Sequence, residues 1–118
     1  MSVEEFLELV LGLPEVTERE SFGEMTGFRV RGKGFCYLSE AKQSIMVKAT
    51  REEQAALIAD DSDTFSPSWT SGRFAWVEIK LPSVDAGQLA ELVIEGWRLS
   101  APKRLAASVL EEISGGDR

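Results

Sequence analysis

Basic and aromatic side chains gather in the segment from Met25 to Arg51. The segment carries six Lys/Arg against Glu40 as its one acid, a net charge of +5, although the whole chain carries −7. Cationic side chains pair with phosphates and aromatic rings stack on bases, so these residue types together suit a nucleic acid. Binding responds to local charge rather than to total charge. This segment is therefore the first candidate binding region, as a local exception on a body too acidic to favour polyanions in general.

The candidate binding residues lie on one face of a predicted sheet or in the turns and loops beside it. They are Arg29, Arg31, Lys33, Phe35, Tyr37, Lys48, Arg73, Trp76 and Lys80. An alternative is a solvated face on which arginine stems cover the aromatic rings and pair with Glu40 and Glu78. A cluster of exposed aromatic side chains would also suit a protein partner or a second copy of the chain.

A second candidate is the turn-rich segment from Phe65 to Phe74. It could form a recognition loop that presents Trp69 and Arg73 beside the sheet. The alternative is a loop whose aromatic side chains close the end of the core, because Trp and Phe in loops usually serve as anchors.

The residue types that catalysis and metal binding most often need are scarce. The chain has no histidine and one cysteine, Cys36, which the alternation places inward as a buried structural thiol. Asp60, Asp61 and Asp63 lack the glycine and distal glutamate of a calcium loop, so we expect a solvated loop there. We expect no catalytic residues, no enzyme activity, no metal and no cofactor.

Length and composition favour one domain over residues 1–118. A chain of 118 residues with 43% hydrophobic and 28% charged residues has ordinary globular composition. No charged-then-apolar leader and no membrane-spanning run is visible. With a single cysteine and hence no internal disulfide, these features predict a cytoplasmic protein that does not enter the membrane.

The hydrophobic periodicity predicts a helix first, then a meander of three strands, then a second helix. Capping boxes at Ser2, Thr50 and Asp85 mark three helix starts, and Pro102 suits the first turn of a last helix. Period-2 alternation marks the strands of the meander and one near residues 75–81. The segment from Glu15 to Glu24 is predicted to be a loop or a short edge strand.

The resulting order is α-β-β-β-α-β(β)-α-α, an α+β fold with two layers. An antiparallel sheet of four to five strands carries the helices on one face and leaves the other face open. The predicted core face carries Phe28, Val30, Cys36, Leu38, Ile45, Val47, Val77 and Ile79. The predicted open face carries Arg29, Arg31, Phe35, Tyr37, Met46, Lys48, Trp76 and Lys80.

Short motifs along most of the chain resemble the MmcQ/YjbR family. They are Leu13-Pro14-Glu15-Val16, Phe22-Gly23, Phe28-Arg29-Val30, Gly32-Lys33-Gly34-Phe35, Val47-Lys48-Ala49, Glu52-Glu53, Phe65-Ser66-Pro67, Trp76-Val77-Glu78-Ile79 and Trp97-Arg98-Leu99. The resemblance implies a small α+β domain similar to CyaY and to secretion chaperones. It also implies possible DNA binding, since the family is described as DNA-binding through a double wing of sheet hairpins. The fold equally suits a non-catalytic protein-interaction or chaperone-like module that meets a partner or a second copy through the open sheet.

Overall fold

The computed structural model of this chain describes residues 1–20 and 24–107. Its elements are α1 (Val3–Leu11), β1 (Val16–Glu20), β2 (Thr26–Val30), β3 (Lys33–Ser39), β4 (Ser44–Thr50), α2 (Arg51–Asp60), β5 (Phe65–Ser71), β6 (Phe74–Lys80) and α3 (Ala86–Ser100). Residues 103–107 are helical after Pro102, as predicted. The motif Phe22-Gly23 and the later apolar positions of the last helix lie outside the described residues. In the described part of the chain, no helix is both long and apolar enough to cross a membrane.

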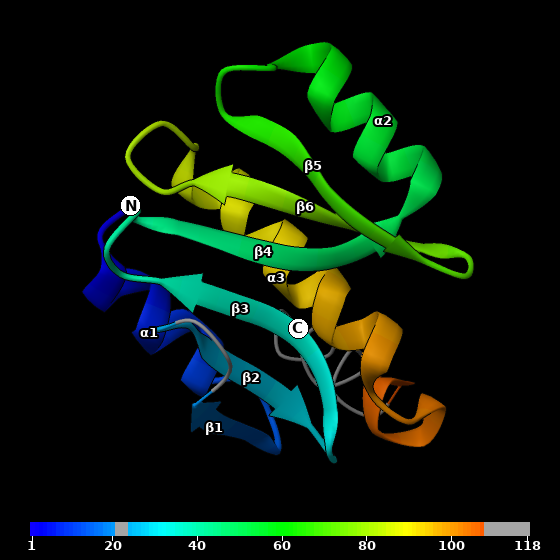
Figure 1. Cartoon of the computed structure of the whole chain (residues 1–118). Helices are drawn as coiled ribbons and strands as arrows, with labels where there is room; N and C mark the ends of the chain where they lie inside the picture. Colours follow the sequence, from blue (N-terminus) through cyan, green and yellow to red (C-terminus); the bar gives the residue numbers. More distant parts are fainter. Residues whose placement is uncertain (21–23, 108–118) are drawn as a thin grey trace, which may run out of the picture.

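One antiparallel sheet runs through the fold in the order β1-β2-β3-β4-β6-β5 (Figure 1). The predicted element order is confirmed, with six strands in place of four to five. Between β4 and β5 the chain passes through α2, so β6 returns between these two strands and β5 forms an outer edge. The segment after α1 forms the other edge, β1, which pairs with β2.

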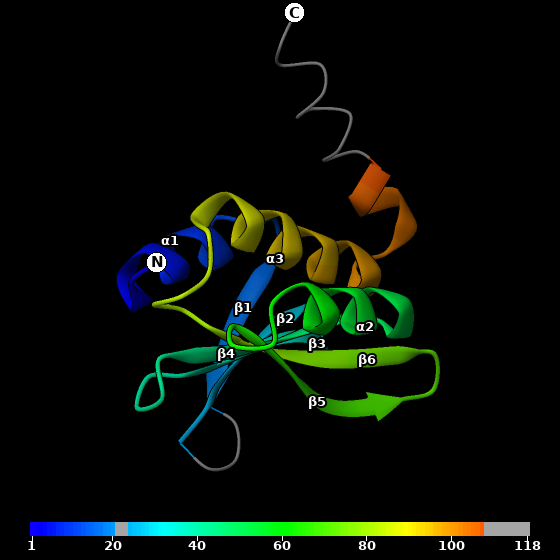
Figure 2. The ribbon, with the colours of Figure 1, turned by 90° about the horizontal axis from the view of Figure 1, so that it is seen from above.

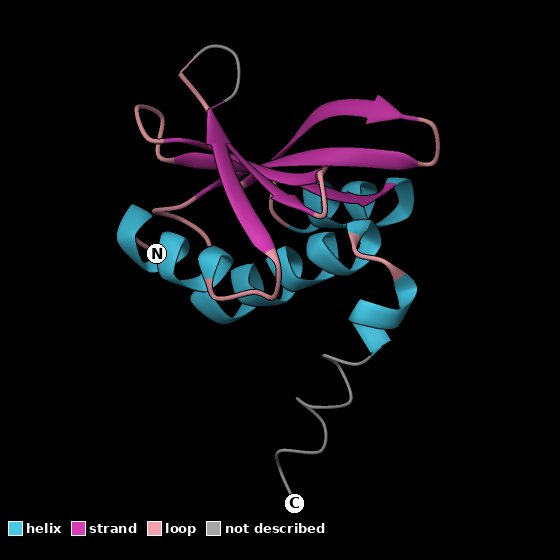
Figure 3. Cartoon of the chain, turned by 90° about the horizontal axis from the view of Figure 1, so that it is seen from below, coloured by secondary structure: helices cyan, strands magenta, loops and turns pink. Residues whose placement is uncertain are grey.

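The helices cover one face of the sheet and leave the other open, as predicted (Figures 2 and 3). The side chains of Ser2, Thr50 and Asp85 accept backbone N–H hydrogen bonds at the starts of α1, α2 and α3, as predicted. The full capping box is formed at Ser2, whose N–H donates to Glu5, while Thr50 and Asp85 show the cap bond alone among the described residues. Each cap satisfies a donor that has no partner inside the helix. These local bonds begin each helix where its apolar face can meet the sheet.

The core lies between the sheet and the helices. All eight residues predicted for the core face are buried, and they meet Phe6 and Val10 of α1 and Leu89, Val93 and Trp97 of α3. The helix α3 approaches β4 closely at Gly96, where an added Cβ would lie 2.8 Å from Val47 Cγ2 and 3.1 Å from the Lys48 carbonyl oxygen. A glycine on α3 thus lets the helix press against β4.

A β-bulge in β3 overturns the prediction that Phe35 lies on the open face. Phe28 pairs with Cys36 and Arg29 pairs with Gly34, so Phe35 is an extra residue without a partner on β2. Such a bulge interrupts the alternation of side chains. Phe35 and Cys36 are consequently both fully buried. Phe35 therefore belongs to the core and is removed from the candidate binding surface.

The segment from Phe65 to Phe74 is a strand and a tight turn rather than a loop. Residues Phe65–Ser71 form β5, and Gly72 and Arg73 turn the chain into β6, with Gly72 at φ +61°. A second bulge sets Ser68 and Trp69 opposite Trp76. This arrangement holds Trp69 against the open face of the sheet and places Arg73 at the tip of the hairpin.

Candidate binding face and cationic end of the sheet

Three aromatic side chains cluster on the open face, and we call Tyr37, Trp69 and Trp76 the aromatic cluster. The rings of Trp69 and Trp76 are stacked, with centroids 4.7 Å apart and planes 17° apart. Tyr37 lies 5.3 Å from Trp76 and 6.1 Å from Trp69 in tilted geometry. Such contacts add to the stability that burial gives and fix the ring planes.

The three rings differ in their exposure to solvent. Trp69 is 39% exposed, whereas Trp76 is only 6% exposed beneath it. The prediction that Trp76 stands on the open side is correct for its strand position, but the bulge in β5 covers it with Trp69. Trp69 is therefore the ring that an incoming ligand can stack upon.

Two glycines form the floor under Tyr37. A Cβ added at Gly27 would lie 3.1 Å from Tyr37 Cε1, and one added at Gly34 would lie 2.6 Å from the Tyr37 hydroxyl oxygen. The ring thus lies flat across β2 and β3 over positions that lack a side chain. A side chain at either glycine would displace the Tyr37 ring from this position.

Positive charge gathers at one end of the sheet, and we call Lys33, Lys48 and Arg73 the cationic end. β3 pairs with β4 only between Cys36 and Ser39, and beyond that point it curves away from β4 (Figure 1). Lys48 lies just past the last pair, so its ammonium reaches the end of α3 and donates to Ser100 Oγ at 3.1 Å. It also lies 4.2 Å from the ring centroid of Phe74.

The surroundings of Lys48 disfavour its charge. Partial burial lowers the pKa of the Lys48 ammonium, and the nearby cations Lys33 and Arg73 lower it further. Arg73 also lies over the Phe74 ring, 5.1 Å from its centroid. Lys33 and Arg73 thus raise the positive potential around the Lys48 ammonium, and an anion bound there would relieve it.

The remaining predicted cations do not join this group. Arg31 occupies the β2–β3 turn at φ +48° and makes a two-point ion pair with Glu15, at 3.0 Å for each hydrogen bond. Lys80 is exposed at the opposite end of β6 from the hairpin tip. Arg29 is half-buried on β2, and its Nε is a buried donor without a hydrogen-bond partner among the described residues.

A carboxylate holds the middle of the open face. Glu78 accepts hydrogen bonds from Ser44 Oγ at 3.4 Å and from Ser66 Oγ at 3.3 Å. Glu78 thus bonds to two serines, whereas the alternative interpretation of the sequence pairs it with an arginine. The open face is therefore aromatic beside the cationic end and polar with a negative charge further along.

The surroundings of Cys36 and of the acidic loop after α2 indicate structural roles. Burial raises the pKa of the Cys36 thiol well above its usual range. The Asp61 carboxylate accepts from the backbone N–H groups of Asp63 and Thr64, which closes the end of α2, and hydrogen bonding lowers its pKa. Among residues 1–20 and 24–107, no three His, Cys, Asp or Glu side chains are grouped to hold a metal ion.

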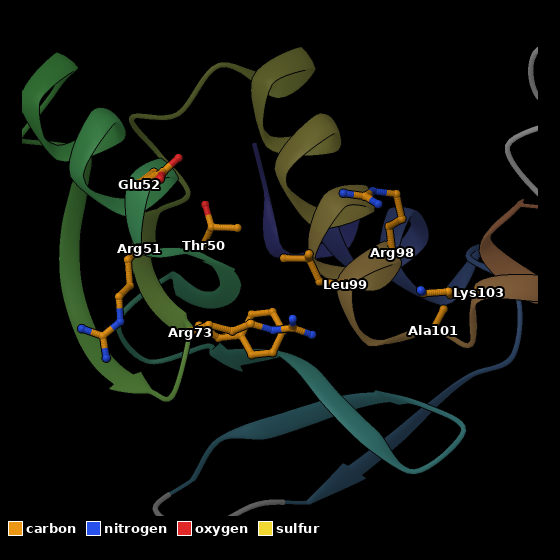
Figure 4. A pocket seen from close by; sticks show the side chains of 9 residues that line it. Thr50, Arg51, Glu52, Arg73, Arg98, Leu99, Ala101 and Lys103 are labelled. Atoms are coloured by element: carbon orange, nitrogen blue, oxygen red, sulfur yellow. The ribbon is translucent and has the colours of Figure 1, made fainter.

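Behind the cationic end lies a pocket of about 660 Å³ between the start of α2, the β5–β6 hairpin and the end of α3 (Figure 4). Four of its lining residues are cations: Arg51, Arg73, Arg98 and Lys103. Of these, the sequence pattern indicated only Arg73. The other three come from helix ends, and no spacing in the sequence reveals that helix ends so far apart in the chain meet.

This chain is similar to a known family in sequence and to solved structures in fold. The family model described as YjbR matches residues 11–99. No curated protein matches the sequence. The crystal structure of Deinococcus radiodurans protein DR2400, which contains a domain described as DUF419, is similar at a TM-score of 0.74 and 20% identity, over 83% of this chain and 77% of that one.

A crystal structure of a Pseudomonas syringae protein is similar at a TM-score of 0.64 and 16% identity, over 85% of this chain and 99% of that one. At these identities the two structures support the fold alone. The family model covers most of the chain, including the meander, α2, the β5–β6 hairpin and nearly all of α3. The chain therefore belongs to the YjbR family.

Proposed function

We propose that this protein binds single-stranded DNA on the open face of its sheet, in a binding role without catalysis. Bases stack on Trp69, and backbone phosphates meet the cationic end formed by Lys33, Lys48 and Arg73. The observation that carries the proposal is the stacked Trp69–Trp76 pair, whose outer ring is exposed and whose inner ring pairs in register with Lys48. Stacking platforms beside a positive groove are how proteins bind single strands without strict sequence preference.

The form of the surface favours unpaired bases over a duplex. An exposed ring on a strand offers its flat side to a base, and a base can reach it only when it is unstacked. The Glu78 carboxylate further along the face repels phosphates, so the strand is expected to follow the aromatic cluster toward the hairpin tip. Arg31 and Lys80 contribute little in this arrangement, because one is paired with Glu15 and the other lies at the far end.

The test is binding of a fluorescently labelled oligo(dT) strand, measured by anisotropy over a range of salt concentrations. If about three phosphates are neutralised, affinity falls with a log–log salt slope of about −2. Trp69→Ala removes the stacking ring and is expected to weaken binding about tenfold, since one base stack contributes about 1–3 kcal/mol. The variant also loses the stacking contact with Trp76, so thermal unfolding is measured to show that it stays folded at the temperature of the binding assay.

Charge reversal tests the cationic end. Lys33→Glu with Arg73→Glu is expected to abolish binding, whereas the matched reversals Arg19→Glu with Lys42→Glu, at exposed positions on β1 and in the β3–β4 turn, leave it nearly unchanged. Binding that survives both the Trp69 variant and the Lys33/Arg73 variant would contradict the proposal.

A second candidate is a protein-interaction module that uses the same face. The supporting observation is that Trp69 is exposed beside Met46, whose sulfur accepts a hydrogen bond from Ser68, so the surface there is apolar as well as aromatic. Pro67 lies in the edge strand β5 and removes a backbone donor, which favours a partner on the face over one added at the edge. Sedimentation equilibrium would show a dimer that Trp69→Ala dissociates; a monomer at all concentrations argues against a second copy.

A further inference from the structure

The pocket behind the cationic end has the size and lining of a small-molecule site. Its volume of about 660 Å³ falls within the range of about 300–1,000 Å³ that is typical of ligand sites. The pocket is bordered by α2, the β5–β6 hairpin and α3 (Figure 4), and its lining residues include none of the three rings of the aromatic cluster. Its residues come from the β4–α2 junction, the β5–β6 hairpin, the end of α3 and the helical segment that follows, so the fold as a whole shapes it.

The lining combines cations with a small apolar wall. Arg73 and Lys103 point toward one another across the opening, Leu99 lies between Arg73 and Arg98, and Ala101 lies beside Lys103 (Figure 4). Glu52 is the one acid in the lining. Cations that converge on an apolar wall suit an anion with an organic body.

The cations differ in how much of their bonding capacity is already used. Arg51 donates from Nε and Nη2 to the Gly72 carbonyl oxygen, at 2.9 and 2.7 Å, which ties the hairpin tip to α2. Arg98 is ion-paired with Glu95 one turn earlier on α3. Arg73 and Lys103 are exposed, and no hydrogen bond or ion pair engages either side chain among the described residues. They are the two groups best able to hold a ligand.

Two further features of the site favour negative charge. The first turn of α2, a helix of ten residues capped by Thr50, opens onto the pocket, so its free N–H groups and dipole favour an anion. Lys48 stands behind Phe74 and adds its field to that of Arg73. Phosphate groups carry the charge and the acceptor oxygens that such a lining can satisfy.

From this lining we propose that the pocket binds a small organic phosphate, of the size of a nucleoside diphosphate. Its phosphate groups meet Arg73 and Lys103, and its organic body rests against Leu99 and Ala101. This site goes beyond the DNA-binding role, since it takes a small ligand on the helical side of the hairpin. The two sites share Arg73 alone, which links them through one side chain.

The test is isothermal titration of ADP into the full-length protein at low salt. We expect a single site, and we expect Arg73→Gln and Lys103→Gln each to weaken ADP binding about tenfold, since a charge-assisted hydrogen bond contributes roughly that factor. The matched variants Arg19→Gln and Lys42→Gln remove the same charge at exposed positions outside the pocket and should leave ADP binding unchanged. Because all four side chains are exposed, the variants should fold, which circular dichroism confirms before titration.

Adenosine serves as the ligand control and is expected to bind far more weakly than ADP. Adenosine binding as tight as ADP binding, or an equal loss of ADP affinity in the pocket variants and their matched controls, would overturn the proposal. Lys103→Gln should leave oligo(dT) binding intact, and Trp69→Ala should leave ADP binding intact. If Lys103→Gln and Trp69→Ala each lose both ADP binding and oligo(dT) binding, the two ligands share one surface, and the proposal of a separate pocket is wrong. If the protein binds ADP but not oligo(dT), the DNA-binding proposal is wrong and the pocket proposal still holds.

Discussion

Cys36 and Lys48 show at the residue scale how surroundings change a side chain that the sequence pattern only assigns to a face. Cys36 falls on the predicted core side and is fully buried, so its pKa rises because a thiolate there would lose its hydration. Lys48 falls on the predicted open side, yet its ammonium reaches Ser100 at the end of α3. Alternation alone predicts that Cys36 is buried. The position of the Lys48 ammonium depends on where β3 stops pairing with β4.

The raised pKa of Cys36 leads to a prediction for alkaline pH. The thiol ionises near pH 8.5 in the unfolded chain but stays neutral in the folded protein, so its contribution to stability is complete below about pH 8.5 and is lost as the pH rises. The free energy of unfolding should fall by up to about 1.4 kcal/mol per pH unit beyond that point. Urea denaturation of the protein and of Cys36→Ala between about pH 7.5 and 9.5 checks this.

The variant lacks the titrating thiol, so its free energy of unfolding should change less steeply with pH, although cavity formation lowers it at every pH. The slope rather than the absolute value is the measurement. Equal slopes for the two proteins would contradict this account of Cys36.

At the scale of elements, the contact between α3 and β4 controls how the helical layer sits on the sheet. Gly96 is buried in this contact, with Val47 and the Lys48 backbone close to where a side chain would begin. The same contact positions Ser100 for its bond with Lys48 and places the end of α3 beside the pocket. A helix that shifts here should disturb both the core and the cationic end.

We therefore predict that Gly96→Ala destabilises the protein by about 1–3 kcal/mol, because the added methyl group overpacks the interface, even though alanine is the better helix former. Gly87→Ala on the first turn of the same helix is the control. There the nearest atom to the added Cβ would be Asp85 Oδ2 at 3.3 Å, the far end of a side chain, so a smaller change is expected. Chemical denaturation measures both variants, and a neutral Gly96→Ala would show that the interface can relax.

At the scale of the whole molecule, an acidic body carries a local positive site. The net charge of −7 and the isoelectric point near 4.6 repel polyanions at long range, while Lys33, Lys48 and Arg73 attract phosphates at short range. Whether the long-range repulsion or the short-range attraction dominates depends on the distance over which salt screens the charges. The screening length is about 8 Å at physiological ionic strength and about 30 Å at 0.01 M.

Removing distant acids should therefore change association only at low salt. Glu8→Gln with Glu91→Gln neutralises two exposed carboxylates on the helical layer, and we expect faster association with oligo(dT) at about 0.01 M salt but no change at about 0.15 M. Stopped-flow fluorescence measures the rates. Lys33→Gln, at the cationic end, should slow association at both salt concentrations; an equal gain for the acid variant at both would contradict this prediction.

The sequence by itself determined the element order, the three helix caps, the core face and the side on which the helices lie. Each of these depends on periodicity or on contacts between residues close in the chain, which neighbouring residue types reveal. The positions of Phe35, Trp69 and Lys48 were decided only by the tertiary structure. Two bulges change which strand residues oppose one another, and the divergence of β3 from β4 leaves room for Lys48 to meet α3.

The pocket, too, was decided only by the tertiary structure. Arg51, Arg98 and Lys103 are ordinary helix-end cations in the sequence, and they converge with Arg73 because the start of α2, the tip of the β5–β6 hairpin, the end of α3 and the start of the next helix meet there. Strand register and helix packing are sums over many contacts between residues far apart in the chain, so no short pattern encodes them. The sequence thus set which residues could bind an anion, and the packing of the elements set where they meet.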